Sequence, residues 1–154
     1  MEVADLLSPD GVIPNLRVTS KKQALQELAR RASELSGASE RAIFDVLLER
    51  ERLGTTGVGN GIAIPHGKLP GLTRLYGMFA RLEQPIPFEA IDEQPVDLIF
   101  LLLAPEGAGA DHLKALARVS RLLRDRGICD KLRGTDKADA IYALLTDSTA
   151  SRAA

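Results

Sequence analysis

Residues 54–68 read GTTGVGNGIAIPHGK and place a high density of glycine around one histidine. The glycines of this stretch are Gly54, Gly57, Gly59, Gly61 and Gly67. Glycine adopts positive φ and allows a ligand to approach closely, so such a loop can turn its N–H groups outward as anion-binding nests do. The short β-branched run Ile62–Ile64 predicts a buried strand, which Pro65 should end because proline has no N–H for a ladder. His66 is therefore expected at a strand end among backbone N–H groups, where an imidazole could receive a phosphoryl group.

Two nucleotide-binding interpretations of the same stretch fail on spacing. A P-loop reads G-x-x-x-x-G-K-S/T. Counting back from Gly67 places Ile62 at the first glycine position, and Leu69 follows where Ser or Thr is required. A dinucleotide fingerprint that begins at Gly57 also meets Ile62 where its third glycine belongs. A glycine-rich hairpin with an exposed histidine remains the alternative that the residues alone leave open.

Length, charge and cysteine content bound the class of protein. A chain of 154 residues is expected to form one domain with a sizeable core. Its net charge of −1 gives no global attraction to nucleic acid or to an anionic membrane. Cys129 is the single cysteine, which excludes an intramolecular disulfide and suits a reducing compartment. The longest apolar run, Leu98–Ala104, is too short to cross a bilayer, and no basic signal-peptide region is visible. We therefore expect a cytoplasmic protein with no membrane insertion and no nucleic-acid partner.

Hydrophobic periodicity predicts two helices ahead of the glycine-rich stretch, after a short turn and an edge strand within residues 1–19. Ser20 is a suitable N-cap for a helix to about Ser36, and Ser39 for a second helix. The expected inward positions are Ala24, Leu25, Leu28, Ala29, Ala32 and Leu35 in the first helix and Ala42, Ile43, Val46, Leu47 and Leu53 in the second. The last turns of the second helix carry four charged residues, which most simply form a solvated face: Glu49, Arg50, Glu51 and Arg52. One arginine among them could nevertheless project over His66, since few residues separate the two.

Beyond the glycine-rich stretch, strands are predicted over residues 75–82 and 96–103. The second is almost continuously apolar, which is typical of a central strand covered on both faces. Asp111 should cap a helix from His112 to about Arg126, and a last helix should span about residues 136–145. The expected inward positions are Leu113, Leu116, Ala117, Ser120 and Leu123 in the first of these helices, with Val119 and Leu122 at the margins, and Ala138, Ile141, Tyr142 and Leu145 in the last. This order of elements predicts an α/β fold, a single-domain sandwich in which helices flank a β-sheet, over residues 1–148, followed by a frayed tail over residues 149–154.

The sequence contains two histidines, and both follow a predicted strand. His112 opens a helix just after the loop that ends the strand over residues 96–103, and helix N-termini attract anions. If the two strands are neighbours, both imidazoles can face one shallow pocket. A neutral imidazole with a pKa near 6.5 has one bare nitrogen at neutral pH, and a second histidine and an arginine can bind phosphoryl oxygens. Two histidines without a nearby cysteine fall short of the ligand set of zinc, so no metal is expected. The alternative interpretation, that His112 only caps the start of a helix, stays open.

These segments resemble the type 2 (fructose/mannitol-like) IIA domains of the bacterial phosphotransferase system, and most of all its nitrogen-regulatory members. The resemblance is carried by GTTGVGNGIAIPHGK, by the preceding Arg-Glu-Arg-Leu-Gly, by PVDLIFLLLAP over residues 95–105 and by His-Leu-x-x-Leu-Ala over residues 112–117. It covers nearly the whole chain and implies a mixed β-sheet sandwiched by helices. One departure is mild, because Thr55-Thr56 stands where many members have Ser-Thr and both hydroxyls are retained.

The resemblance also implies the roles of individual residues. His66 matches the histidine that is phosphorylated through Nε2, His112 the second active-site histidine, and Arg50 the arginine beside the phosphate. The residues expected in the phosphate-binding loop are Thr55, Thr56, Gly57, Gly59, Asn60, Gly61 and Gly67. No metal and no small cofactor is implied.

The expected partners follow from the same resemblance. A nitrogen-type HPr-like phosphocarrier would phosphorylate the protein, and an upstream enzyme I would charge that carrier from phosphoenolpyruvate. The chain shows no fused IIB or membrane IIC domain, which favours regulation of targets such as potassium transporters or sensor kinases over sugar uptake. The alternative is a relay that passes phosphate to a IIB domain. An apolar rim of Ile62, Ile64, Leu69 and Leu72 is expected around His66 as a docking face.

Overall fold

The apolar strand predicted over residues 96–103 is the centre of a six-stranded mixed sheet. The strands are β1 (Leu7–Leu16), β2 (Gly57–Gly59), β3 (Ile62–Ala63), β4 (His66–Leu69), β5 (Tyr76–Ile86) and β6 (Val96–Pro105). The sheet order is β1-β5-β6-β3-β2, and β4 also pairs with β6. β5 runs antiparallel to β6, whereas β3 and β4 run parallel to it. The computed structural model describes residues 1–147, so the tail predicted over residues 149–154 lies outside the described residues.

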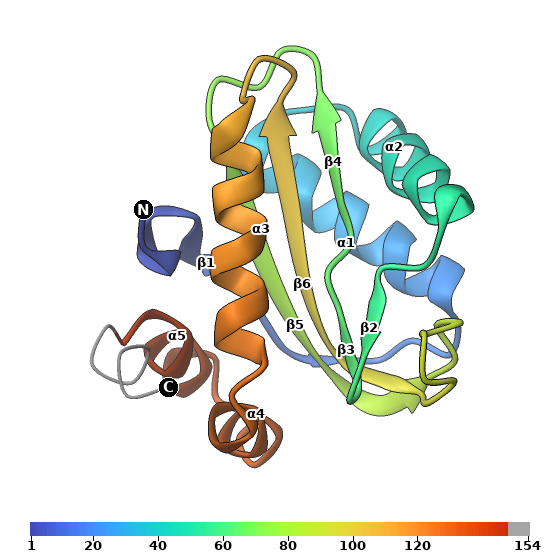
Figure 1. The fold of residues 1–154 in the computed structure, drawn as a ribbon, viewed down its shortest axis with the longest axis vertical. Coiled ribbons are helices and arrows are strands. Elements are labelled where there is room, and N and C mark those ends of the chain that lie inside the picture. Colours follow the sequence, from blue (N-terminus) through green and yellow to red (C-terminus); the bar gives the residue numbers. More distant parts are fainter. Residues whose placement is uncertain (148–154) are drawn as a thin grey trace.

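Helices cover both faces of the sheet, as the predicted sandwich requires (Figure 1). The helices are the short 3₁₀ turn η1 (Val3–Asp5), α1 (Lys21–Ser36), α2 (Glu40–Leu53), α3 (Ala110–Leu123), α4 (Arg126–Arg133) and α5 (Ala138–Thr146). Alternate residues of β6 enter two separate cores. Ile99, Leu101 and Leu103 pack with α1 and α2, while Leu98, Phe100 and Leu102 pack with α3, α4 and α5. Because both faces are buried, the central strand carries no polar alternation.

The N-terminal helices agree with their sequence signals. The Ser20 hydroxyl accepts a hydrogen bond from the Gln23 N–H, and the Ser39 hydroxyl accepts one from the Ala42 N–H. The predicted edge strand is β1, a ten-residue strand at the edge of the sheet. An edge position tolerates Pro9 and Pro14, because one side of the strand needs no ladder donors.

The strand that begins at Ile62 ends before Pro65, as expected, but a second strand, β4, begins directly after the proline. Ile62 lies opposite Leu98 and His66 lies opposite Leu102, so β3 and β4 keep one register along β6. The Pro65 carbonyl accepts a hydrogen bond from the Leu102 N–H at 3.0 Å, which carries the ladder across the proline. Proline lacks the donor but keeps its acceptor, and the edge of a sheet requires only one of the two. His66 is therefore the first residue of β4 and not a residue beyond a strand.

The helix predicted from His112 to about Arg126 is α3, and the helix that follows it, α4, was not predicted. α3 ends at Leu123, and the Asp125 side chain accepts a hydrogen bond from the Ile128 N–H as the N-cap of α4. Asp125 has an extended backbone, which breaks the helix where the periodic pattern continues. The predicted N-cap of α3 is also wrong, because Gly109 occupies that position and makes no side-chain cap.

Several predicted inward positions face solvent. Leu113 is 69% exposed and Leu53 is 82% exposed, whereas Ala115 and Val119 are fully buried. The buried face of α3 is His112, Ala115, Val119, Leu122 and Leu123, one position away from the expected set. Ala42 of α2 is exposed as well. The predicted spacing of buried residues along α3 was correct, but the wrong face of the helix was predicted to be buried, since α3 carries leucines on two faces.

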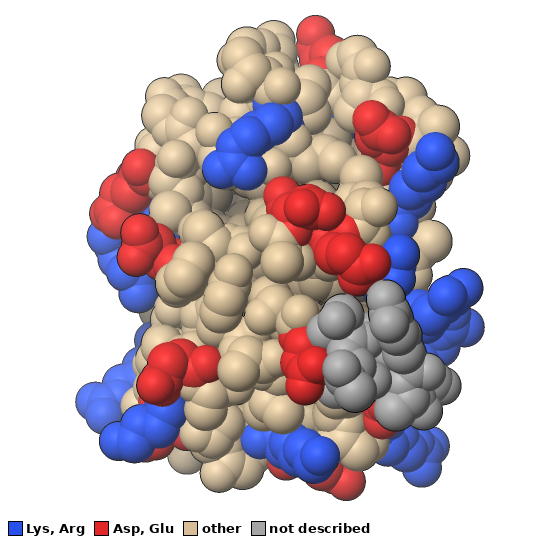
Figure 2. Space-filling view, turned by 90° about the vertical axis from the view of Figure 1, so that its left-hand side faces the viewer, with Lys and Arg blue, Asp and Glu red and all other residues tan. Residues whose placement is uncertain are grey.

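Charges of both signs are distributed over the surface. Figure 2 shows the side that carries the N-terminus and α5, where acidic groups lie across the centre and basic groups lie mainly toward the margins. Within residues 1–147, no helix is both long enough and apolar enough to cross a membrane.

Helix α2 packs directly on the backbone of β4. A Cβ atom added at Gly67 would lie 2.2 Å from Cγ1 of Val46, far inside van der Waals contact. Gly67 pairs with Leu103, which faces α1 and α2, so it is on the α2 side of the sheet. Glycine at residue 67 therefore sets the closest approach of α2, and Arg50 lies one helical turn beyond Val46.

We expect Gly67→Ala to destabilise the protein by about 1–3 kcal/mol, because the β-branched Val46 cannot move away easily. Adding Val46→Ala should recover part of this loss. The double variant should therefore lose less stability than the sum of the losses measured for the two single variants. Urea unfolding followed by circular dichroism measures both. Gly107→Ala is the control, since nothing lies within 4 Å of its added Cβ. Strict additivity of the two changes would contradict the contact.

Candidate functional site

The ring of His66 is fixed by a hydrogen bond to its own chain. Its Nδ1 lies 2.8 Å from the Ile64 carbonyl oxygen. A carbonyl oxygen can only accept, so Nδ1 carries the proton and Nε2 of the neutral ring keeps its lone pair. The nucleophilic nitrogen is thus set by backbone geometry.

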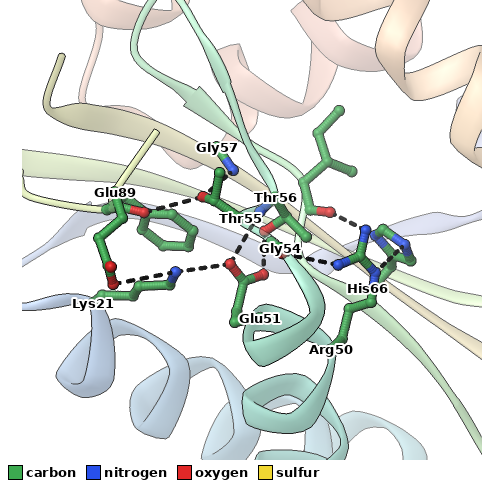
Figure 3. Close-up of polar contacts among 11 residues, drawn as sticks. Lys21, Arg50, Glu51, Gly54, Thr55, Thr56, Gly57, His66 and Glu89 are labelled. Carbon is green, nitrogen blue, oxygen red and sulfur yellow. Dashed lines mark hydrogen bonds and ion pairs between the residues drawn. The ribbon is translucent and has the colours of Figure 1, made fainter. Parts of the chain in front are cut away.

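Arg50 reaches the other nitrogen of this ring from the last turn of α2. Its Nε donates to His66 Nε2 at 3.3 Å, and its Nη1 donates to the Gly54 carbonyl at 2.9 Å. Figure 3 shows the guanidinium of Arg50 beside the imidazole of His66. Within residues 1–147, β4 pairs only with β6 and its other edge is open, so Arg50 can reach around that edge to a ring on the opposite face of the sheet. The residues that resemblance placed together do lie together.

His112 is the second histidine of the site. It lies in the first turn of α3, and its ring centroid is 5.6 Å from that of His66 with an interplanar angle of 71°. His112 is 7% exposed, and its buried Nε2 has no hydrogen-bond partner within residues 1–147. Helix capping does not describe this geometry, because the side chain points inward to His66. A buried unsatisfied nitrogen is costly, and a ligand oxygen would remove the cost.

Both histidines are held in the neutral form. Burial lowers the pKa of His66, the Ile64 hydrogen bond opposes this, and the charge of Arg50 lowers the pKa further. Burial also lowers the pKa of His112, with smaller contributions from His66 and Lys68. The stability that the neutral rings contribute is present above the unfolded-state pKa, near 6.5, and is lost as the pH falls through the folded-state values. At neutral pH the lone pair of His66 is therefore available.

The start of the glycine-rich stretch is anchored by a residue that sequence reasoning had assigned to a solvated face. Glu51 is buried, and its carboxylate accepts hydrogen bonds from the Thr56 N–H at 3.0 Å and from the Thr56 hydroxyl. Thr55 is held by a hydrogen bond from its hydroxyl to the Phe88 carbonyl. A signal for Glu51 was present, because Ile43, Leu47 and Glu51 repeat every four residues along the buried face of α2.

The rest of the predicted phosphate-binding loop lies elsewhere. Asn60 and Gly61 form the turn of the β2–β3 hairpin with φ values of 57° and 80°. The Gly61 carbonyl accepts from the Leu98 N–H, whereas His66 lies opposite Leu102, about 13 Å further along the strand. At the tip, the Asn60 N–H donates to Asp92. The structure does not bring Gly59, Asn60 and Gly61 to His66.

Two further glycines of that prediction act through packing. A Cβ at Gly57 would lie 2.8 Å from Cβ of Ala90, and Gly67 contacts Val46. At Gly57 and Gly67, the space that a missing side chain leaves is therefore filled by side chains of the protein, Ala90 and Val46.

The predicted apolar rim is mostly core. Ile62, Ile64 and Leu69 are at most 5% exposed, since Ile62 and Ile64 belong to one of the two cores and Leu69 to the other. Leu113, which follows His112, and Val58, which lies between Gly57 and Gly59, are exposed apolar side chains. Lys68, which is exposed and lies on the same face of β4 as His66, adds positive charge that sequence reasoning did not assign. No group of three or more His, Cys, Asp or Glu side chains within the described residues is arranged to hold a metal ion.

Fold and site together define a class of protein. Residues 5–148 match the family described as Phosphoenolpyruvate-dependent sugar phosphotransferase system, EIIA 2, and the chain belongs to this family. A nitrogen regulatory protein from Bradyrhizobium diazoefficiens is 65% identical over 145 residues, which cover 94% of this chain and 95% of the relative. One from Klebsiella oxytoca is 40% identical, covering 96% of this chain and 92% of the relative. The crystal structure of nitrogen regulatory protein IIA-Ntr from Neisseria meningitidis has a TM-score of 0.89 at 35% identity, covering 94% of this chain and 99% of that chain. The family resemblance read from the sequence is confirmed.

The titration of His66 tests the electrostatics of the site. We expect its pKa to lie below the ordinary value of about 6.5 and to rise in Arg50→Gln, because the guanidinium charge disfavours the imidazolium. NMR titration of the ring carbons and nitrogens measures this. Arg52→Gln, which alters an exposed charge two residues away, is the control. A His66 pKa above the ordinary value, or one unchanged by Arg50→Gln, would contradict the assignment.

Proposed function

We propose that the protein is a nitrogen-regulatory IIA protein that accepts a phosphoryl group on Nε2 of His66. The single observation that carries this proposal is the hydrogen bond from His66 Nδ1 to the Ile64 carbonyl, which leaves Nε2 without a proton. The donor would be the phosphohistidine of an HPr-like carrier, which an enzyme I charges from phosphoenolpyruvate. Membership of the phosphotransferase-system family supports this chemistry.

The transfer requires little covalent help from the protein. The Nε2 lone pair attacks phosphorus, the bond from phosphorus to the carrier's nitrogen breaks, and that nitrogen keeps the electron pair. Catalysis is then alignment of the nucleophile and stabilisation of the equatorial oxygens. In the unphosphorylated protein Arg50 Nε occupies the position next to Nε2, so its guanidinium has to turn toward the incoming oxygens. The Gly54 carbonyl keeps it close during this movement.

His112 would supply the second contact to the phosphoryl group. Its Nε2 is buried without a partner, and its ring faces that of His66. With a proton on Nε2, the neutral ring donates to a phosphoryl oxygen and satisfies a nitrogen that otherwise has no partner. Lys68 adds positive charge on the same face.

Phosphorylation would control which proteins bind this face. A phosphoryl group adds roughly −1.5 to −2 charges, which are costly to desolvate unless the partner offers a cation. The similarity to nitrogen regulatory proteins supports this regulatory output over a relay to a IIB domain. Targets such as potassium transporters or sensor kinases are the partners that we expect, with the unphosphorylated form as the binding form.

Replacing His66 by Ala should abolish phosphorylation and leave the fold intact, because the half-buried ring contributes little packing. Intact-mass analysis after incubation with phosphoenolpyruvate, enzyme I and its carrier measures it. As companions, His112→Asn and Arg50→Gln should still accept phosphate, but more slowly by roughly 10- to 150-fold, since each loses a contact of about 1.5–3 kcal/mol. A stoichiometric phosphate on His66→Ala would disprove the assignment.

The regulatory output predicts a difference between two states of one protein. Unphosphorylated wild type and His66→Ala should capture the same target, while phosphorylated wild type should release it and His66→Glu should bind it weakly. Quantitative pull-downs with these baits test this. Equal recovery of every partner in both phosphorylation states would leave a simple phosphate carrier, and transfer of the phosphate to a IIB domain would favour the alternative.

A further inference from the structure

A buried ion pair lies beneath the glycine-rich stretch. The side chain of Glu51 is 4% exposed, and Lys21 Nζ, itself on an 18% exposed side chain, lies 2.9 Å from one of its oxygens. The same carboxylate accepts from the Thr56 N–H and from the Thr56 hydroxyl. Lys21 also lies over the Phe88 ring at 4.7 Å, so the pair connects α1, α2 and the segment that follows β5.

From this pair, backbone hydrogen bonds lead directly to His66 (Figure 3). The Thr56 carbonyl accepts from the Ile64 N–H at 3.0 Å. The Ile64 carbonyl accepts from His66 Nδ1 at 2.8 Å. Arg50, the neighbour of Glu51 in α2, then bonds to His66 Nε2, which closes a ring of polar contacts around the loop. Arg50 and Glu51, two consecutive residues of α2, thus both act on His66. Arg50 bonds to Nε2 directly, and Glu51 is connected to Nδ1 through Thr56 and Ile64.

Stability alone is a weak explanation for this ion pair. Taking two charges out of water costs several kcal/mol, and a well-packed apolar pair is often as stable or more so. An apolar pair could not accept the Thr56 N–H, however, and the loop backbone would lose its fixed position. The charged pair therefore supplies geometry that an apolar pair cannot supply.

We propose that Glu51, with Lys21 as its counter-ion, is a positioning residue that keeps His66 in the Nδ1–H tautomer through Thr56 and Ile64. The carboxylate fixes both the N–H and the hydroxyl of Thr56, and the Thr56 carbonyl in turn holds the N–H of Ile64, the residue whose own carbonyl accepts from His66. Because the Ile64 carbonyl then points at Nδ1, Nε2 stays unprotonated and accepts the hydrogen bond from Arg50. This inference rests on the proposed role of His66 as phosphoryl acceptor, but the tautomer itself can be measured without phosphorylation.

Two electroneutral double variants separate geometry from charge. In Lys21→Met/Glu51→Gln, the amide oxygen can accept the Thr56 N–H and the amide nitrogen can donate to the Thr56 hydroxyl. In Lys21→Met/Glu51→Leu, the volume is filled but both contacts to Thr56 are lost. Neither variant leaves a buried unpaired charge. Glu49→Gln, an exposed change in the same helix, is the matched control.

The readout is the His66 tautomer in two-bond ¹H–¹⁵N correlation spectra of the unphosphorylated protein, at a pH where the ring is neutral. The glutamine variant should keep the Nδ1–H form, and the leucine variant should show a mixture with the Nε2–H form. Phosphorylation by the carrier should be slower in the leucine variant than in the glutamine variant by at least about tenfold, since a misplacement near 1 Å can cost about a hundredfold. A folded leucine variant with one Nδ1–H tautomer and the rate of the glutamine variant would overturn the proposal.

If the leucine variant does not fold, Thr56→Val provides the test. It removes only the hydroxyl contact to Glu51 and keeps the Thr56 N–H. A detectable Nε2–H population in this variant supports the proposal, and an unchanged tautomer overturns it. If neither the wild type nor any variant accepts phosphate, the proposed role of His66 as phosphoryl acceptor is wrong. The tautomer measured in the unphosphorylated protein then still decides whether Glu51 positions His66.

Discussion

The hydrogen bond from His66 Nδ1 to the Ile64 carbonyl is the contact on which the whole site depends. An imidazole in water exchanges between two tautomers, and only one of them presents Nε2 as a nucleophile. A carbonyl two residues earlier in the same strand selects that tautomer at 2.8 Å. Burial and Arg50 then lower the pKa of His66, so the selected form stays neutral at physiological pH. Selection by the backbone requires a rigid Ile64 peptide, and much of the surrounding structure serves that rigidity.

The sheet supplies this rigidity and also brings the partners of His66 together. Because β3 and β4 keep one register along β6 across Pro65, the backbone of Ile64 and Pro65 is held between two strands that pair with β6. His66 and Gly67 then point to opposite faces. His66 meets His112 of α3 on one face, while Gly67 admits Val46 of α2 on the other. The absence of a side chain at Gly67 brings α2 close enough for Arg50 to reach around the open edge of β4.

Much of this arrangement could be predicted from the sequence. The apolar run over residues 96–103 indicated the central strand, and the two histidines that follow predicted strands indicated that their rings could lie together, as they do. The structure places Asn60-Gly61 at a hairpin tip away from His66, in agreement with the glycine-rich hairpin that the residues left open, because Asn-Gly is a strong hairpin-turn signal. Glu51 was missed. A glutamate on a buried helical face is rare, and the partners that make it stable, Lys21 and Thr56, become neighbours only in the folded chain.

The nitrogen that carries the phosphate in the phosphorylated protein tests the central claim most directly. Uniformly ¹⁵N-labelled protein would be phosphorylated through enzyme I and its carrier, and the phosphorus–nitrogen coupling of His66 would be read by NMR. The account predicts a phosphate on Nε2, with the Nδ1 proton still bonded to the Ile64 carbonyl. A phosphate on Nδ1 would require that hydrogen bond to break before transfer, and it would contradict selection of the nucleophile by the strand.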